Sequence, residues 1–195
     1  MKRLYTRIAC LTLALLMLAS PGITEAFTLN SAANLTAAIS TLEAMKAETD
    51  ALEVTGCRSW KRKVKLMDWY HGGSSVLRLD GYGYIYDIKT GITLRVKRCG
   101  GTSHADLEPA TKKDTYKLWK LDHGFSWDRR PVILFCHGKY VAASINTKPH
   151  GKQTIRSNGF KGQFCLHMLN SRTHGSKRVD GDHMSCVRQA YNWAH

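Results

Sequence analysis

A series of short strand-like segments separated by turn sequences, beginning at Ser59, constrains the fold most strongly. The segments YGYIYDI, ITLRVKR, PVILFCHGKYVAAS and QFCLHML have the alternation or the β-branched content of strands. Between them lie HGGSS, LDGYG, KTGI, CGGTSH, SNGFKG and RTHGS, which are rich in glycine and other turn residues. The pattern predicts an α+β domain with a mixed, mainly antiparallel sheet.

Two hairpins and two flanking helices complete this prediction. The hairpins are expected to turn at 89–91 and at 137–138, where glycine is available. One helix is predicted from Glu108 to Leu121, with a proline in its first turn. The other is predicted in the C-terminal segment, with Asp180 or Asp182 as its N-cap.

Two further segments precede this domain. Residues 1–26 combine a basic start, a 12-residue apolar run and a small-residue exit, which is typical of a secretory signal peptide. The run is too short to cross a hydrocarbon core of about 30 Å, so we expect no transmembrane segment after signal removal. Residues 27–56 contain an amphipathic helix over 30–53, which serves as a spacer, packs on the domain or pairs with another copy. The basic domain is then 57–195.

The charge of the chain indicates which partners to expect. Its formal net charge is +14, and the part from Thr55 onward carries 25 Lys and Arg against 10 Asp and Glu. Inside a cell, such a domain would suggest nucleic acid. In a secreted protein, it favours peptidoglycan, anionic wall polymers or lipid headgroups instead, and no nucleic acid.

The cysteines point to a free thiol. Six are present, and five remain after removal of the signal, so at least one is free or pairs between chains. Their wide spacing, without a Cys-x-x-Cys, fits neither a small disulfide framework nor a zinc ribbon. A free thiol in a secreted protein is a candidate for chemistry, and a buried, inert cysteine is the alternative.

The stretch FCLHMLNSRTHGS contains the best candidate for that chemistry. On a strand, Cys165 and His167 share a face, and so do His104 and Asp106 in SHADLEP. One hypothesis is thiol catalysis without a cofactor, with Cys165 as nucleophile and His167 or His174 as base. Asp106 would orient an imidazole. The strand alone favours a buried cysteine in the core.

A second hypothesis is a zinc hydrolase. Catalytic zinc takes three protein ligands and a water, and His104, Asp106 and His167 would supply the ligands. Glu108 or His174 would act as base. No helical His-Glu-x-x-His is present, so the pattern is a general one.

Two further residues are candidates for substrate binding. Arg130, in FSWDRRPVI, would clamp a substrate carboxylate, with a structural Arg–Asp pair beside a packed tryptophan as the alternative. His150, in KPHGKQ, lies beside a turn, where sites are often built.

Several motifs in order, from LMDWYHGG through SHADLEP and SWDRRP to FCLH and SRTHGS, carry a resemblance. This run, about Lys65 to Ala190, resembles an uncharacterised domain of exported, cell-wall-associated proteins of Gram-positive bacteria. The resemblance implies a cell-wall context. Its motifs correspond here to His104, Asp106, Glu108, Arg130, His150, Cys165, His167, His174 and His183.

The motif HMSCVR is weakly similar to the catalytic motif of L,D-transpeptidases, which cross-link peptidoglycan with a cysteine activated by a histidine. The Ser-His-Gly of that family is missing before Cys186, so FCLH is the more plausible place for the thiol. We therefore expect a secreted cell-envelope protein that acts on peptidoglycan or its peptides as a transpeptidase or hydrolase. A non-catalytic basic wall-binding module with structural histidines is the remaining alternative.

Overall fold

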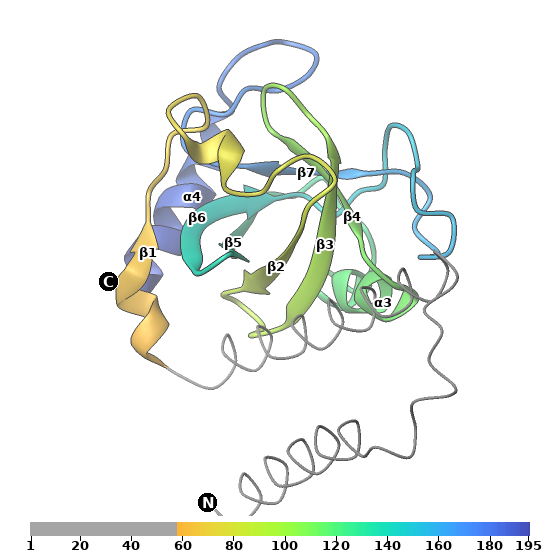
Figure 1. Ribbon diagram of the computed structural model, residues 1–195, viewed down its shortest axis with the longest axis horizontal. Coiled ribbons are helices and arrows are strands. Elements are labelled where there is room, and N and C mark those ends of the chain that lie inside the picture. Colours follow the sequence, from red (N-terminus) through yellow and green to blue (C-terminus); the bar gives the residue numbers. More distant parts are fainter. Residues whose placement is uncertain (1–57) are drawn as a thin grey trace, which may run out of the picture. The chain divides into compact units, whose positions relative to one another are not determined.

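The computed structural model describes residues 58–195, shown in Figure 1. The expected signal peptide at 1–26 and the helix at 30–53 lie outside the described residues. The strands are β1 (Val64–Lys65), β2 (Tyr82–Asp87), β3 (Thr93–Gly100), β4 (Ala105–Pro109), β5 (Arg130–Cys136), β6 (Lys139–Ile145) and β7 (Phe164–His167). The helices are α3 (Lys112–Lys120) and α4 (Gly181–Ala194), with short 3-10 turns η1 (Arg58–Lys63) and η2 (Gly73–Ser75).

The strands form a closed barrel. Their order is β1-β6-β5-β2-β3-β4-β7, and β7 also pairs with β6, which closes a ring of six strands. Every pairing within this ring is antiparallel, whereas β1 is added to β6 in parallel. The expected α+β class and mainly antiparallel sheet are confirmed. Closure was not predicted, because strand patterns do not reveal which two edges meet.

Both predicted hairpins are present. The first joins β2 to β3, and the Asp87 side chain accepts a hydrogen bond from the Thr90 backbone amide at 2.8 Å. The second joins β5 to β6 through His137 and Gly138, both with positive φ. A glycine adopts that conformation without a Cβ clash, which explains its place in the turn.

The apolar core fills the barrel. Alternate residues of each strand point inward, such as Leu94 and Val96 on β3, Leu107 on β4, and Phe164 and Leu166 on β7, and all five are fully buried. Each such side chain contributes about 1.5–3 kcal/mol on burial. Because these positions face inward, their strand neighbours on β4 and β7 face outward.

Helix α3 begins later than the sequence predicted. Its N-cap is Thr111, whose side chain accepts a hydrogen bond from the Asp114 amide, whereas Glu108 and Pro109 end strand β4. The Glu108 carboxylate is buried and accepts hydrogen bonds from the backbone of 154–155. The expected helix start at Glu108 was therefore wrong, because pairing with β3 and these bonds outweigh the local helical pattern.

Helix α4 begins where the sequence predicted. The Asp180 side chain is its N-cap and accepts a hydrogen bond from the His183 amide at 2.9 Å. The helix packs on β5 and β6 (Figure 1). Its buried face includes His183, Cys186 and Val187. Within residues 58–195, no helix has the length and apolar character needed to span a membrane.

Candidate functional site

The candidate site lies on the outer face of the barrel. Asp106 on β4 stands directly opposite Cys165 on β7, and His167 stands opposite Ser144 on β6. Since Leu166 points into the core, its neighbours Cys165 and His167 point outward, as the strand prediction required. Three neighbouring strands thus present polar side chains to one region outside the barrel.

A cavity of about 210 Å³ opens at this region. Its lining comes from β7, α4 and the loops around them, and consists of His104, Trp127, Arg129, Asn146, His150, Cys165, His167, Thr173, His174 and His183. Five of the seven residues predicted for the site line this cavity, and Asp106 contacts two of them. Arg130 is the residue that does not join them.

Cys165 is surrounded by groups that favour its thiolate. Its Sγ accepts a hydrogen bond from Asn146 Nδ2 at 2.9 Å and lies 3.9 Å from His150 Nε2. Burial raises the pKa of this thiol, but interactions with four imidazoles outweigh burial and hold the pKa well below its usual value. The residue is 7 % exposed, so the sulfur is sheltered yet borders the cavity. These are the conditions of a reactive cysteine.

His104 is the buried cation beside this sulfur. Its Nδ1 donates to the Arg172 carbonyl at 2.7 Å, and its Nε2 lies 3.3 Å from Asp106 Oδ1. Burial lowers the pKa of His104, but the interactions with Asp106 and Cys165 outweigh it and raise the pKa to about 9. The arrangement is a thiolate–imidazolium pair at neutral pH.

Three imidazoles are stacked against one another. The His104 and His167 rings are 4.4 Å apart, and the His167 and His183 rings are 3.8 Å apart and nearly parallel. Burial and the neighbouring imidazoles lower the pKa of His167 to about 4, so this ring is neutral at pH 7. Ser144 Oγ lies 2.8 Å from His183 Nδ1 and fixes the ring that α4 contributes.

Asp106 connects two of the imidazoles. Its Oδ1 lies 3.0 Å from His174 Nε2 as well as beside His104. Although burial raises the pKa of Asp106, both histidines lower it, and the net shift is downward. The side chain of His174 is 50 % exposed, so it forms the outer rim, and His104 the inner wall. Asp106 therefore contacts both imidazoles, which its predicted role of orienting one of them would require.

Two groups of side chains have the geometry to hold a metal ion. Cys165, His104 and His167 offer donor atoms within 4.8 Å of one another, and so do His104, Asp106 and His174. The predicted set of His104, Asp106 and His167 is not one of these two groups, because Asp106 groups with His174 and His167 groups with Cys165. Thiolate, imidazole and carboxylate donors suit zinc. His167 Nδ1 is buried without a hydrogen-bond partner, so this nitrogen has bonding capacity for such an ion.

Arg129, rather than its neighbour, is the arginine at the cavity. Its Nη2 donates to Asp180 Oδ2 at 2.6 Å and so ties the N-cap of α4 to the loop before β5. The adjacent Trp127 is 51 % exposed, and its ring lies 5.0 Å from that of His150. This pair forms an aromatic edge beside Cys165.

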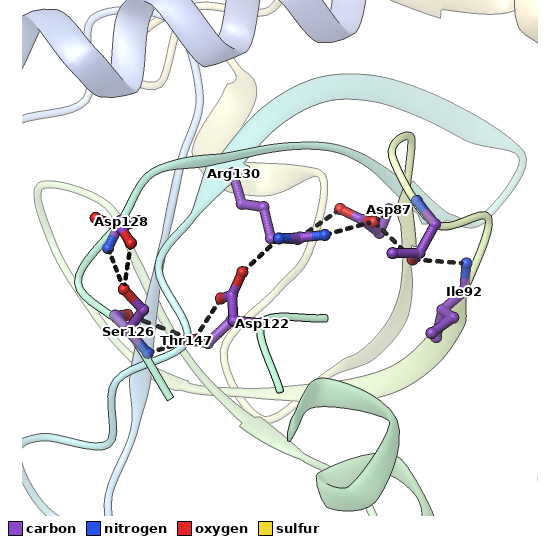
Figure 2. A network of polar contacts seen from close by, with 8 residues as sticks. Asp87, Ile92, Asp122, Ser126, Asp128, Arg130 and Thr147 are labelled. Carbon is purple, nitrogen blue, oxygen red and sulfur yellow. Dashed lines mark hydrogen bonds and ion pairs between the residues drawn. The ribbon is translucent and has the colours of Figure 1, made fainter. Parts of the chain in front are cut away.

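Arg130 lies in a buried ion network, drawn in Figure 2. Its Nε and Nη2 donate to the two oxygens of Asp87 at 2.9 and 3.1 Å, and its Nη1 donates to Asp122. Asp122 Oδ2 in turn accepts from Thr147 Oγ1 at 2.9 Å. The guanidinium is already bound by two carboxylates and does not line the cavity. This geometry is that of the structural Arg–Asp pair, the alternative to a substrate clamp.

The other thiols have different surroundings. Cys99 has its pKa raised to about 11, chiefly by burial, and burial also raises the pKa of Cys186 on α4. Cys99, Cys165 and Cys186 are free thiols. Among these three, Cys165 alone has a lowered pKa.

Among the residues that contact the site, sequence reasoning missed Asn146 and Ser144. Asn146 directly follows β6, and Ser144 is buried on it beneath α4. Each lies next to Ile145, which points into the core, so the alternation of a strand places both side chains outward. That alternation was the available signal. It is informative only once β6 is known to pair with β7.

Comparison with known proteins does not extend this description. No protein-family model matches the chain, and searches of curated proteins and of solved structures find no significant match.

Proposed function

We propose that this protein is a secreted cell-envelope enzyme in which Cys165 is the nucleophile of acyl transfer on peptidoglycan peptides. The observation that carries the proposal is the position of its sulfur, which borders a cavity and contacts Asn146 and several imidazoles. The thiolate is the nucleophilic form of cysteine, and neighbouring cations stabilise it. Such a nucleophile forms covalent acyl intermediates with carbonyl substrates.

His150 is the best-placed proton donor. Its Nε2 lies 3.9 Å from the sulfur, and its ring is partly exposed at the cavity. Contact with Cys165 raises the pKa of His150, so it is more readily protonated than an ordinary histidine. The low pKa of His167 makes that ring a poor donor, and His174 is engaged with Asp106. His104 then stabilises the thiolate by its positive charge, and Asp106 stabilises the protonated form of His104.

The reaction begins when the thiolate attacks the carbonyl carbon of an amide, forming a carbon–sulfur bond and an oxyanion. The carbon–nitrogen bond then breaks, and the leaving amine keeps its electron pair and receives a proton from the His150 imidazolium. The resulting thioester is released by an acceptor amine or by water, which gives its proton back to His150. The first outcome is transpeptidation, and the second is hydrolysis.

The cell-wall setting has independent support in the sequence. Residues 1–26 have the pattern of a signal peptide, and the basic excess from Thr55 onward suits an anionic envelope. The motifs from SHADLEP to SRTHGS resemble those of wall-associated domains. Peptidoglycan contains both the amide bonds and the amines that the reaction requires.

Incubation with purified peptidoglycan fragments tests the proposal. We expect the mature protein to release or join peptides, detected by mass spectrometry, and Cys165→Ser to abolish the change. Cys186→Ser is the matched control and should retain activity, because Cys186 does not line the cavity. Equal activity of wild type and Cys165→Ser would contradict the proposal. Binding to the wall without any product would favour the non-catalytic module.

A zinc hydrolase is the second candidate function. It is favoured by the unpartnered Nδ1 of His167 and by the donor atoms of His104, Cys165 and His167, which lie in one group. These three residues would hold the ion, and zinc would supply an activated water. Elemental analysis of protein purified without chelator tests it. One zinc per chain, lost in His167→Ala, is expected for a zinc enzyme, and metal-free protein with full activity would exclude it.

A further inference from the structure

Asn146 has a single polar side-chain contact among the described residues, and that contact is the nucleophile. Its Nδ2 lies 2.9 Å from Cys165 Sγ, while its Oδ1 is buried without a hydrogen-bond partner. A buried polar atom left unpaired costs about 1–3 kcal/mol, so the fold alone does not account for an asparagine here. We propose that Asn146 is a catalytic residue that donates a hydrogen bond to the oxyanion formed when Cys165 attacks a carbonyl.

This role rests on the proposed nucleophile and follows from where charge moves in the reaction. Before attack, the negative charge is on the Cys165 sulfur, and the Asn146 amide donates to it. During attack, the charge passes to the carbonyl oxygen, which is bonded to the carbon that the sulfur has joined. A donor resting against the sulfur therefore lies within reach of the new oxyanion. Donors aimed at developing charge stabilise the transition state more than the ground state.

The chain around Asn146 is held in place, as an oxyanion donor requires. The next residue, Thr147, donates its backbone amide to the Ser126 carbonyl at 3.0 Å and its hydroxyl to Asp122 at 2.9 Å. Asp122 is held by Arg130, and Figure 2 shows this path from Asp87 to Ser126. Preorganised donors need no rearrangement during the reaction, which increases their effect.

Two small reagents separate this role from the reactivity of the thiol itself. p-Nitrophenyl acetate acylates a thiolate through an oxyanion: the carbon–sulfur bond forms, and p-nitrophenolate leaves with the electron pair of the broken carbon–oxygen bond. Iodoacetamide alkylates the same sulfur by displacing iodide, and no oxyanion forms. Both reactions can be assigned to Cys165 by peptide mass spectrometry. They are compared at a pH at which the thiol is ionised in each variant.

We expect Asn146→Ala to slow acylation of Cys165 by about 10²–10³-fold, as for loss of one oxyanion donor. Alkylation should change by less than about tenfold, since only the ground-state contact to sulfur is lost. Asn146→Ser keeps a donor and should lie between wild type and Asn146→Ala, which also covers a failure of the alanine variant to fold. Asn192→Ala, on the exposed face of α4, should change neither rate.

Two results would overturn the inference. Equal slowing of acylation and alkylation in Asn146→Ala, or no slowing of either, would remove the oxyanion role and leave Cys165 as the nucleophile. A wild-type protein that p-nitrophenyl acetate does not acylate at Cys165 would refute the nucleophile, and the role of Asn146 with it.

Discussion

The Cys165 site and the Arg130 network both bury charged groups, but they differ in how those groups are satisfied. The Arg130 guanidinium is shared between two carboxylates, and its partner Asp87 is fully buried. At the Cys165 site, His167 Nδ1 and Asn146 Oδ1 are buried without hydrogen-bond partners, and a cavity adjoins these two residues. A structural network satisfies itself, whereas a reactive site leaves bonding capacity for a ligand.

Burial of a charged side chain therefore does not by itself identify a functional site. Sequence reasoning assigned Arg130 to substrate binding because an arginine beside a strand end suits a carboxylate. The structure places two protein carboxylates where a substrate carboxylate was expected. A charged side chain was thus a weaker guide to the site than buried polar atoms without partners and an adjoining cavity.

The largest expected effect is a loss of stability when the Arg130 network is broken. Arg130→Met leaves the Asp87 and Asp122 carboxylates without their cation, and breaking a buried pair costs about 3–5 kcal/mol. Urea unfolding followed by fluorescence measures this loss. The neighbouring Arg129→Met breaks a partly exposed pair and should cost less than about 1 kcal/mol. Equal losses in the two variants would contradict the distinction.

The second prediction concerns Asp106, which supports the charge of His104 beside the Cys165 thiolate. Asp106→Asn removes the negative charge beside His104, so the pKa of His104 falls and the thiolate–imidazolium pair is less stable. A higher thiol pKa moves the pH at which alkylation of Cys165 is half-maximal upward by the same amount, and we expect a shift of about one pH unit. Asp80→Asn, at an exposed surface pair, should leave this pH profile unchanged. An unchanged pH profile in Asp106→Asn would show that Asp106 does not act through His104.

The smallest effect is expected on folding when the nucleophile itself is removed. Cys165→Ala removes a buried thiolate, but His104 keeps Asp106 as its counter-charge and no buried charge is left unpaired, so the free energy of unfolding should fall by less than the roughly 3–5 kcal/mol expected for Arg130→Met. Urea unfolding of the variant beside wild type measures it. A loss comparable to that of Arg130→Met would show that Cys165 is a structural residue.

Much of the fold was predictable from local patterns. Alternation identified the strand with Cys165, glycine turns identified both hairpins, and Asp180 was correctly proposed as the cap of α4. Helix α3 was placed too early, because Glu108 has a helical context in sequence but binds the backbone of 154–155 in the fold. Local signals do not include such long-range bonds.

The residues of the site could be predicted from the sequence better than the contacts between them. Cys165, His167, His104 and Asp106 were selected because residues two apart on a strand share a face. These residues come together because β4 pairs with β7 and β7 pairs with β6 to close the barrel. The sequence does not reveal either pairing. The same pairings place Asn146 beside the sulfur, so its contact could not be predicted.

The pH dependence of Cys165 alkylation tests the central claim most directly. Imidazoles hold the pKa of Cys165 well below that of an ordinary thiol, so its thiolate persists as the pH falls, and His104, with a pKa of about 9, stays protonated up to that pH. We predict a rate constant, resolved by peptide mass spectrometry, that is nearly flat from about pH 5 to 8, with no labelling of Cys99, whose pKa is about 11. A rate for Cys165 that rises about tenfold per pH unit toward 8.5 is the behaviour of an ordinary thiol and would contradict the account.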